Sequence, residues 1–217
     1  MADPLSQAWA ALDIANLRDS LDRYSAMVTG VVHRYGTAAA ALAAHYYEAE
    51  RAAAGIPGSF RVKPARPAGL DQVTEAVHWA TKGLWTSHLT EEDIASARSL
   101  TEGLAEKYAL DAGRITVIHA VHADRKATGW ARVTEPGACS FCLLLAIRGA
   151  VYRSERSAGF DSHDHCHCHV QPIFGAAYEP SAEVRRAEAI YRGVRTTPGG
   201  PKAVRNAFRA ALAADQK

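Results

Sequence analysis

The chain has 217 residues, a length that suits one large domain or one domain with appendages. Its 25 basic and 23 acidic residues nearly balance, so the overall charge does not call for a polyanionic partner. No stretch approaches the roughly 18 consecutive apolar residues of a membrane span. The N-terminus lacks a basic region followed by an apolar run, which argues against a secretory signal. We therefore expect the protein to function in a reducing cytoplasm. Clustered cysteines in that compartment more often bind metal than form disulfides.

The first 125 residues have the spacing of helices. Asp3 before Pro4 is typical of an N-cap followed by proline in the first turn. We expect the first long helix to end at Gly36 and an alanine-rich helix to follow over 38–54, whose small side chains would let another helix approach closely. The first long helix has apolar residues at steps of three and four, on one face: Ile14, Leu17, Leu21, Tyr24, Val28, Val31 and Tyr35.

Residues 55–69 contain three prolines and three glycines, which predict an extended connection between helices. A third helix is expected from Asp71. Thr90 and Asp93 resemble a capping box that begins a longer helix, which Gly103 and Gly113 are expected to kink or split.

Short strands are predicted after residue 126, over 130–134, 149–153 and 166–174. The last segment, 181–217, returns to helix with eight basic residues against three acidic ones. The predicted fold is therefore mainly α. It has a helical N-terminal body over 1–125, a small zinc-binding β-containing module over 126–175, and a basic helical C-terminal tail over 176–217.

All four cysteines lie in two short runs, "CSFC" at 139–142 and "HDHCHCH" at 163–169. A gap of two residues lets both sulfurs of one tight turn reach one ion, and a second cysteine and histidine cluster follows about twenty residues later. This spacing is typical of a structural zinc site.

Two ligand sets remain open from the sequence. In a plain strand Cys166 and Cys168 share one face, so they complete a four-cysteine site with Cys139 and Cys142. A turn at 162–165 would instead direct His163 inward in place of one cysteine. Zinc is the expected metal, although iron also fits four thiolates.

The stretches 129–152 and 163–174 resemble the MuF-like head morphogenesis proteins of tailed phages, most closely those of actinobacterial phages. Asp164 stands where the family has a proline, which bears on loop shape. The residues that carry the resemblance are Cys139, Cys142, Gly149, Tyr152, His163, Cys166, Cys168, Pro172 and Phe174.

The resemblance implies a minor capsid protein of the virion, associated with the portal vertex and acting in head assembly and DNA packaging or ejection. It implies portal and capsid proteins as partners, possible scaffold contact, and a location in the phage head after synthesis in the bacterial host cytoplasm. We expect no membrane partner. Some relatives are labelled capsid maturation proteases.

An enzymatic reading has little support from the residues. Ser140 lacks the surroundings of a nucleophile elbow, and zinc would occupy the thiolates of Cys139 and Cys142. His119 and His122 lie one helical turn apart and can bind metal or place a base, but more often they mark a helix end. No catalytic residue is assigned, and a non-enzymatic function is preferred.

A third hypothesis is a nucleic-acid-binding zinc module. The arginines of the C-terminal tail could contact the phosphates of packaged DNA. No interleaved aromatic residues support base stacking there, and the same arginines suit the solvated face of two short helices.

Overall fold

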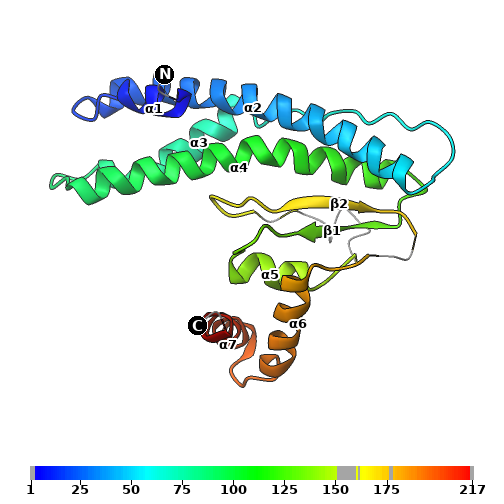
Figure 1. The fold of residues 1–217 in the computed structure, drawn as a ribbon. Coiled ribbons are helices and arrows are strands. Elements are labelled where there is room, and N and C mark those ends of the chain that lie inside the picture. Colours follow the sequence, from blue (N-terminus) through cyan, green and yellow to red (C-terminus); the bar gives the residue numbers. More distant parts are fainter. Residues whose placement is uncertain (1–2, 151–159, 161, 176–177, 216–217) are drawn as a thin grey trace. The chain divides into compact units, whose positions relative to one another are not determined.

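The computed structural model describes residues 3–150, 160, 162–175 and 178–215. These residues form seven α-helices, one 3-10 turn and two strands, so the predicted mainly α fold is confirmed (Figure 1). The chain divides into two compact units. The first unit comprises 1–49, 59–120 and 160–166, and the second comprises 50–58, 121–159 and 167–217.

Helix α1 (Pro4–Ala10) begins as predicted. The Asp3 carboxylate accepts hydrogen bonds from the backbone N–H groups of Leu5 and Ser6 at 3.0 and 3.1 Å. Hydrogen bonds from the Ser6 hydroxyl and backbone hold the pKa of Asp3 below its ordinary value. Trp9 of this helix packs edge-on against Tyr24, with ring centroids 5.9 Å apart.

Helix α2 (Leu17–Ala53) runs without interruption through Gly36, so the predicted helix end there was wrong. Gly36 is buried, and a Cβ at this position would lie 3.0 Å from the Cβ of Pro67. The glycine therefore admits the proline-rich connection against the helix and does not terminate it. The buried stripe follows the prediction to Val28 and then passes through Val32, which leaves Tyr35 exposed.

Helix α3 (Leu70–Ala80) and the 3-10 turn η1 (Lys82–Leu84) precede α4 (Glu91–Ala123). The predicted capping box is present, because the Thr90 N–H donates to the Asp93 carboxylate at 3.0 Å and the Asp93 N–H donates to the Thr90 hydroxyl at 3.2 Å. Helix α4 is not split at either glycine. Gly113 lies where an added Cβ would be 3.2 Å from the carbonyl oxygen of Ala39.

The expected close approach of the alanine-rich helix is thus confirmed, and α2 and α4 run side by side in the first unit (Figure 1). The core of this unit gathers apolar side chains from α1, α2, α3 and α4. Its fully buried members include Val28, Val32, Val73 and Val77.

The second unit pairs strand β1 (Gly129–Val133) antiparallel with β2 (His169–Ile173), with Ala131 opposite Gln171. Helices α5 (Ser140–Ala146), α6 (Ala182–Val194) and α7 (Gly200–Asp215) complete it (Figure 1). The first predicted strand is confirmed, the predicted extended stretch becomes a strand at His169, and residues 151–153 of the remaining one lie outside the described residues. The helices share one core: Leu143, Ala146, Val184, Ala187, Phe208 and Leu212.

Within the described ranges, no helix combines the length and apolar composition that crossing a bilayer requires.

Candidate metal centre

The first cysteine pair occupies the start of α5. Cys139 is the N-cap, with extended backbone angles (φ −67°, ψ 159°), and its sulfur accepts a hydrogen bond from the Cys142 N–H at 3.5 Å. Cys142 lies within the first helical turn and is buried. The cap geometry therefore holds the two sulfurs on one side of a single turn, as the two-residue gap predicts.

The second run forms a turn at Asp164–His165 before β2 begins at His169. His165 takes a positive φ of 57°, which a residue other than glycine seldom adopts. The sequence left such a turn open as the alternative that directs His163 inward. Residues 163–169 therefore do not form a plain strand over their whole length.

These segments bring all five predicted ligand residues into two overlapping groups. The ligand atoms of Cys139, Cys142 and His163 lie within 4.8 Å of one another, and so do the sulfurs of Cys142, Cys166 and Cys168. Zinc bonded tetrahedrally to sulfur at 2.3 Å separates two sulfurs by about 3.8 Å, so the spacing within each group suits a zinc ion. Cys142 belongs to both groups. The cluster could hold a metal ion.

The donor chemistry of the cluster fits a structural zinc ion. The structure holds the four cysteines as thiols, and Cys142, Cys166 and Cys168 are at most 4% exposed. Thiolates and imidazole are the donors that structural zinc sites use. The three buried sulfurs are shielded from water, whereas Cys139 is exposed and His163 is half-buried. A bound ion would cross-link the start of α5 to the segment leading into β2.

A buried arginine lies beside the cluster. Arg132 on β1 is 1% exposed, and its Nη1 lies 3.8 Å from the Cys142 sulfur. Three or four thiolates carry more negative charge than a divalent ion neutralises, so an adjacent guanidinium stabilises them in the charged form. Sequence reasoning missed this residue, because β1 is buried along nearly its whole length and gives no alternating pattern to single it out.

A second buried arginine supports the ligand run in the first unit. Arg114 on α4 donates to the backbone carbonyl of Cys166 and to Asp111, the latter at 2.7 Å. Its guanidinium also lies 4.8 Å from the centre of the Phe160 ring. The Ser162 hydroxyl donates to the same Asp111 carboxylate at 3.0 Å. Asp111 on α4 thus holds both Arg114 and the segment that contains Ser162.

Because Gly103 has no side chain, the turn at Asp164–His165 can pack closely against α4. A Cβ there would lie 2.8 Å from both the Asp164 Cβ and the His165 Nε2, closer than real contacts allow. His165 Nδ1 in turn lies 3.0 Å from a carboxylate oxygen of Glu106, one turn along the helix. The glycine thus serves close packing and not helix breaking, which only the spatial neighbours reveal.

The Gly103→Ala variant should therefore be less stable than the native protein, by about 1–3 kcal/mol, because overpacking exceeds the gain in helix propensity. Gly30 in α2 offers a matched control, since nothing lies within 4 Å of a Cβ added there. Gly30→Ala should stabilise the protein by up to about 1 kcal/mol. Urea unfolding of the two variants measures both effects; equal stabilisation by both would contradict the packing of the turn on Gly103.

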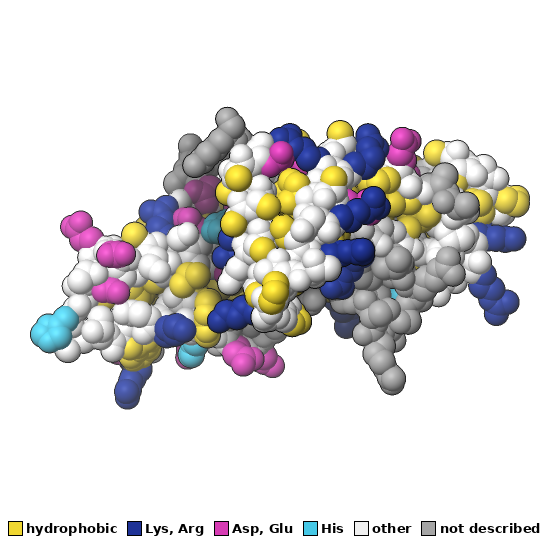
Figure 2. Space-filling view, turned by 90° about the horizontal axis from the view of Figure 1, so that it is seen from below, with side chains coloured by type: hydrophobic (Ala, Val, Ile, Leu, Met, Phe, Trp, Pro, Cys, Tyr) yellow, Lys and Arg dark blue, Asp and Glu magenta, His cyan; other side chains and the backbone are white. Residues whose placement is uncertain are grey.

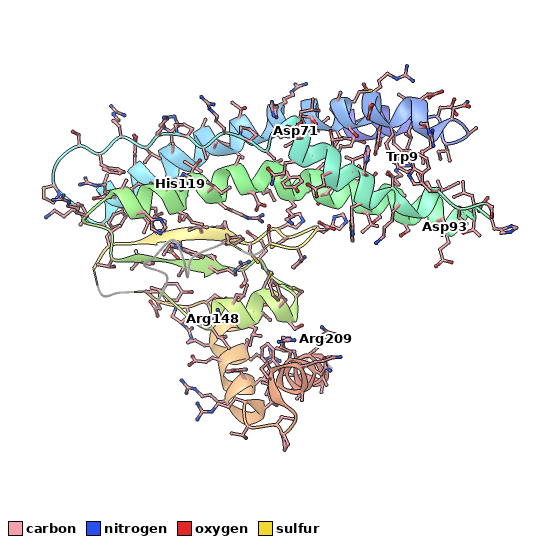
Figure 3. All side chains as sticks on the ribbon, turned by 180° about the vertical axis from the view of Figure 1, so that it is seen from behind. Trp9, Asp71, Asp93, His119, Arg148 and Arg209 are labelled. Atoms are coloured by element: carbon pink, nitrogen blue, oxygen red, sulfur yellow. The ribbon has the colours of Figure 1, made fainter. Side chains whose placement is uncertain are left out.

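The other candidate groups do not assemble into a catalytic site among the described residues. Figure 3 labels His119, which lies on α4 and is exposed. The Asp124 carboxylate near it in sequence accepts a hydrogen bond from Arg51 at 2.8 Å. Ser140 is the first residue of α5.

The model of the VG15 protein family matches residues 1–194, from the N-terminus to the end of α6. The chain belongs to the VG15 protein family. This match covers both ligand runs and suggests a phage-encoded protein. No curated protein and no solved structure matches the chain.

Proposed function

We propose that this VG15 family member is a MuF-like minor capsid protein of the phage head, associated with the portal and acting in head assembly and DNA packaging or ejection. The cysteine and histidine cluster within a phage-related family is the observation that supports this proposal. Portal and capsid proteins are the proposed partners, with possible scaffold contact and a possible contact between the basic tail and packaged DNA.

We propose zinc as a structural ion held by four of the five residues Cys139, Cys142, His163, Cys166 and Cys168. The ion would supply a cross-link and not a reactive centre. The β1–β2 pair has only two short strands, and a sheet of this size is marginally stable without further support. Metal binding adds the stability that so small a module lacks.

Two measurements test this proposal together. Element analysis of the purified chain should find one zinc per molecule, and mass spectrometry of purified phage particles should find the chain in DNA-filled heads. The chain's absence from particles would overturn the virion role, and absence of metal would overturn the structural zinc.

The maturation protease remains the competing function and has its own assay. Co-expression with the capsid and scaffold chains of the same phage should leave both uncut. Cleavage that Ser140→Ala abolishes, with metal content unchanged, would favour the protease over the structural protein.

A further inference from the structure

The second unit contains a hollow that the metal centre does not use. It has a volume of about 690 Å³ and lies among the end of α5, helix α6 and the turn that leads into α7. Four arginines line it, Arg148, Arg192, Arg195 and Arg205, together with one acidic residue, Glu188.

The charges around this arginine hollow are unbalanced. Arg192 pairs with Glu188 at 2.5 Å. Arg148, Arg195 and Arg205 are exposed, and none has a carboxylate partner in the part of the chain that the structure describes. The first turn of α7, which borders the hollow, also contains no acidic residue. The rim therefore carries an excess of positive charge that suits an anionic ligand.

The floor of the hollow is apolar. Leu144, Ile147, Tyr191 and Val204 line it and are half-buried, so part of each side chain still faces the opening. Figure 2 shows hydrophobic side chains and Lys or Arg side chains next to one another on the face seen from below. A ligand that fills the hollow must satisfy both the arginine rim and the apolar floor.

We propose that the arginine hollow binds a segment of a partner protein that carries acidic side chains beside apolar ones. Carboxylates of such a segment would pair with the rim arginines, which bind them through two parallel N–H donors. Its apolar side chains would cover the floor. This inference rests on the proposed function, because it supplies the surface through which the chain docks onto another head protein.

The apolar floor of the arginine hollow favours a protein segment over DNA as the ligand. DNA phosphates would pair with the arginines but would leave the apolar side chains facing a hydrated backbone. Base stacking needs an accessible aromatic face. Tyr191 is the only aromatic lining residue in the described part of the hollow, and it packs edge-on against Phe208 at 5.8 Å.

A displayed library of short random peptides, selected on the metal-loaded full-length chain, tests the proposal. We expect the selected peptides to combine Asp or Glu with Leu, Ile or Phe. A labelled peptide from this selection should bind the Arg148→Glu/Arg205→Glu double variant at least about tenfold more weakly in fluorescence anisotropy. The same peptide with lysine in place of each acidic residue should bind that double variant better than it binds the native chain.

The Arg18→Glu/Arg66→Glu variant is the matched control, because both arginines are exposed, lie in the first unit and give the same change in net charge. It should bind the acidic peptide as the native chain does. Selection of peptides without acidic residues, or equal losses in both double variants, would overturn the proposal. So would double-stranded DNA that competes with the peptide and loses affinity only in the Arg148→Glu/Arg205→Glu variant.

The outcome is separable from that of the proposed function. If the chain is absent from phage heads but still binds the peptide through Arg148 and Arg205, the proposed virion role is wrong and the proposed binding of acidic segments in the arginine hollow is supported. If the chain is present in heads and the peptide selection fails, the docking surface lies elsewhere.

Discussion

Replacing Cys142 with serine is expected to lower the zinc content from one ion per chain to almost none. Among the described residues, Cys142 belongs to both ligand groups, and its sulfur lies beside the buried Arg132. Loss of a structural zinc removes stabilisation on the order of 10 kcal/mol where binding and folding are coupled. The segment comprising β1, α5 and β2 should therefore lose its fixed packing, while α2 and α4 keep most of the helical signal.

Element analysis, near-ultraviolet circular dichroism and limited proteolysis measure this change, and a chelator added to the native chain should reproduce it. Ser140→Ala is the control within the same turn, because it alters a neighbour that has no ligand atom of the required kind. Native-like proteolysis and full zinc content in Cys142→Ser would show that the cysteine cluster does not hold the metal.

The Arg51→Met variant is expected to lose about 3–5 kcal/mol of stability, because it leaves a buried carboxylate without its charged partner. Arg51 lies in the last turn of α2, and its Nε donates to Asp124 at 2.8 Å, with both side chains less than 10% exposed. The same guanidinium donates to the carbonyl oxygens of Ile56, Pro57 and Gly58 at 3.2, 3.2 and 2.6 Å. One guanidinium thus donates hydrogen bonds both to the carbonyl oxygens of the loop after α2 and to the carboxylate that follows α4.

Arg61→Met provides the comparison for this second effect. Arg61 pairs with Glu48 at 3.1 Å, but its side chain is 87% exposed, and pairs in water contribute little. Thermal unfolding should show a fall in Tm for Arg51→Met that is several times larger than the fall for Arg61→Met. Similar falls would mean that the buried pair contributes no more than an exposed one.

The buried ion pair and the cysteines of the ligand cluster connect different segments of the chain. The Arg51–Asp124 pair connects residues 50–58 to the segment that precedes β1, and the cysteines connect α5 to β2. Neither contact needs a large apolar core. In the described part of the second unit the core shared by α5, α6 and α7 is small, and a pair of short strands is only marginally stable by itself.

Features that depend on neighbours in the chain were predictable from the sequence alone. The Asp3 cap and the Thr90–Asp93 capping box form as expected, because each uses groups within three residues. The helical stripe to Val28 follows from 3.6 residues per turn, and the two cysteine runs identify the donor types by spacing. Local geometry is sufficient in these cases, because no distant residue alters the outcome.

Only the tertiary structure decided the features that depend on residues far apart in the chain. Gly36 and Gly103 resemble helix breakers in sequence, yet each sits inside a helix where Pro67 or Asp164 packs against it. Arg132 and the Arg51–Asp124 pair have no local signature, because an arginine is exposed by default until a partner buries it. The sequence allowed either a plain strand or a turn before Cys166. Contacts with α4, such as the hydrogen bond from Ser162 to Asp111, favour the turn that places His163 near the cysteines.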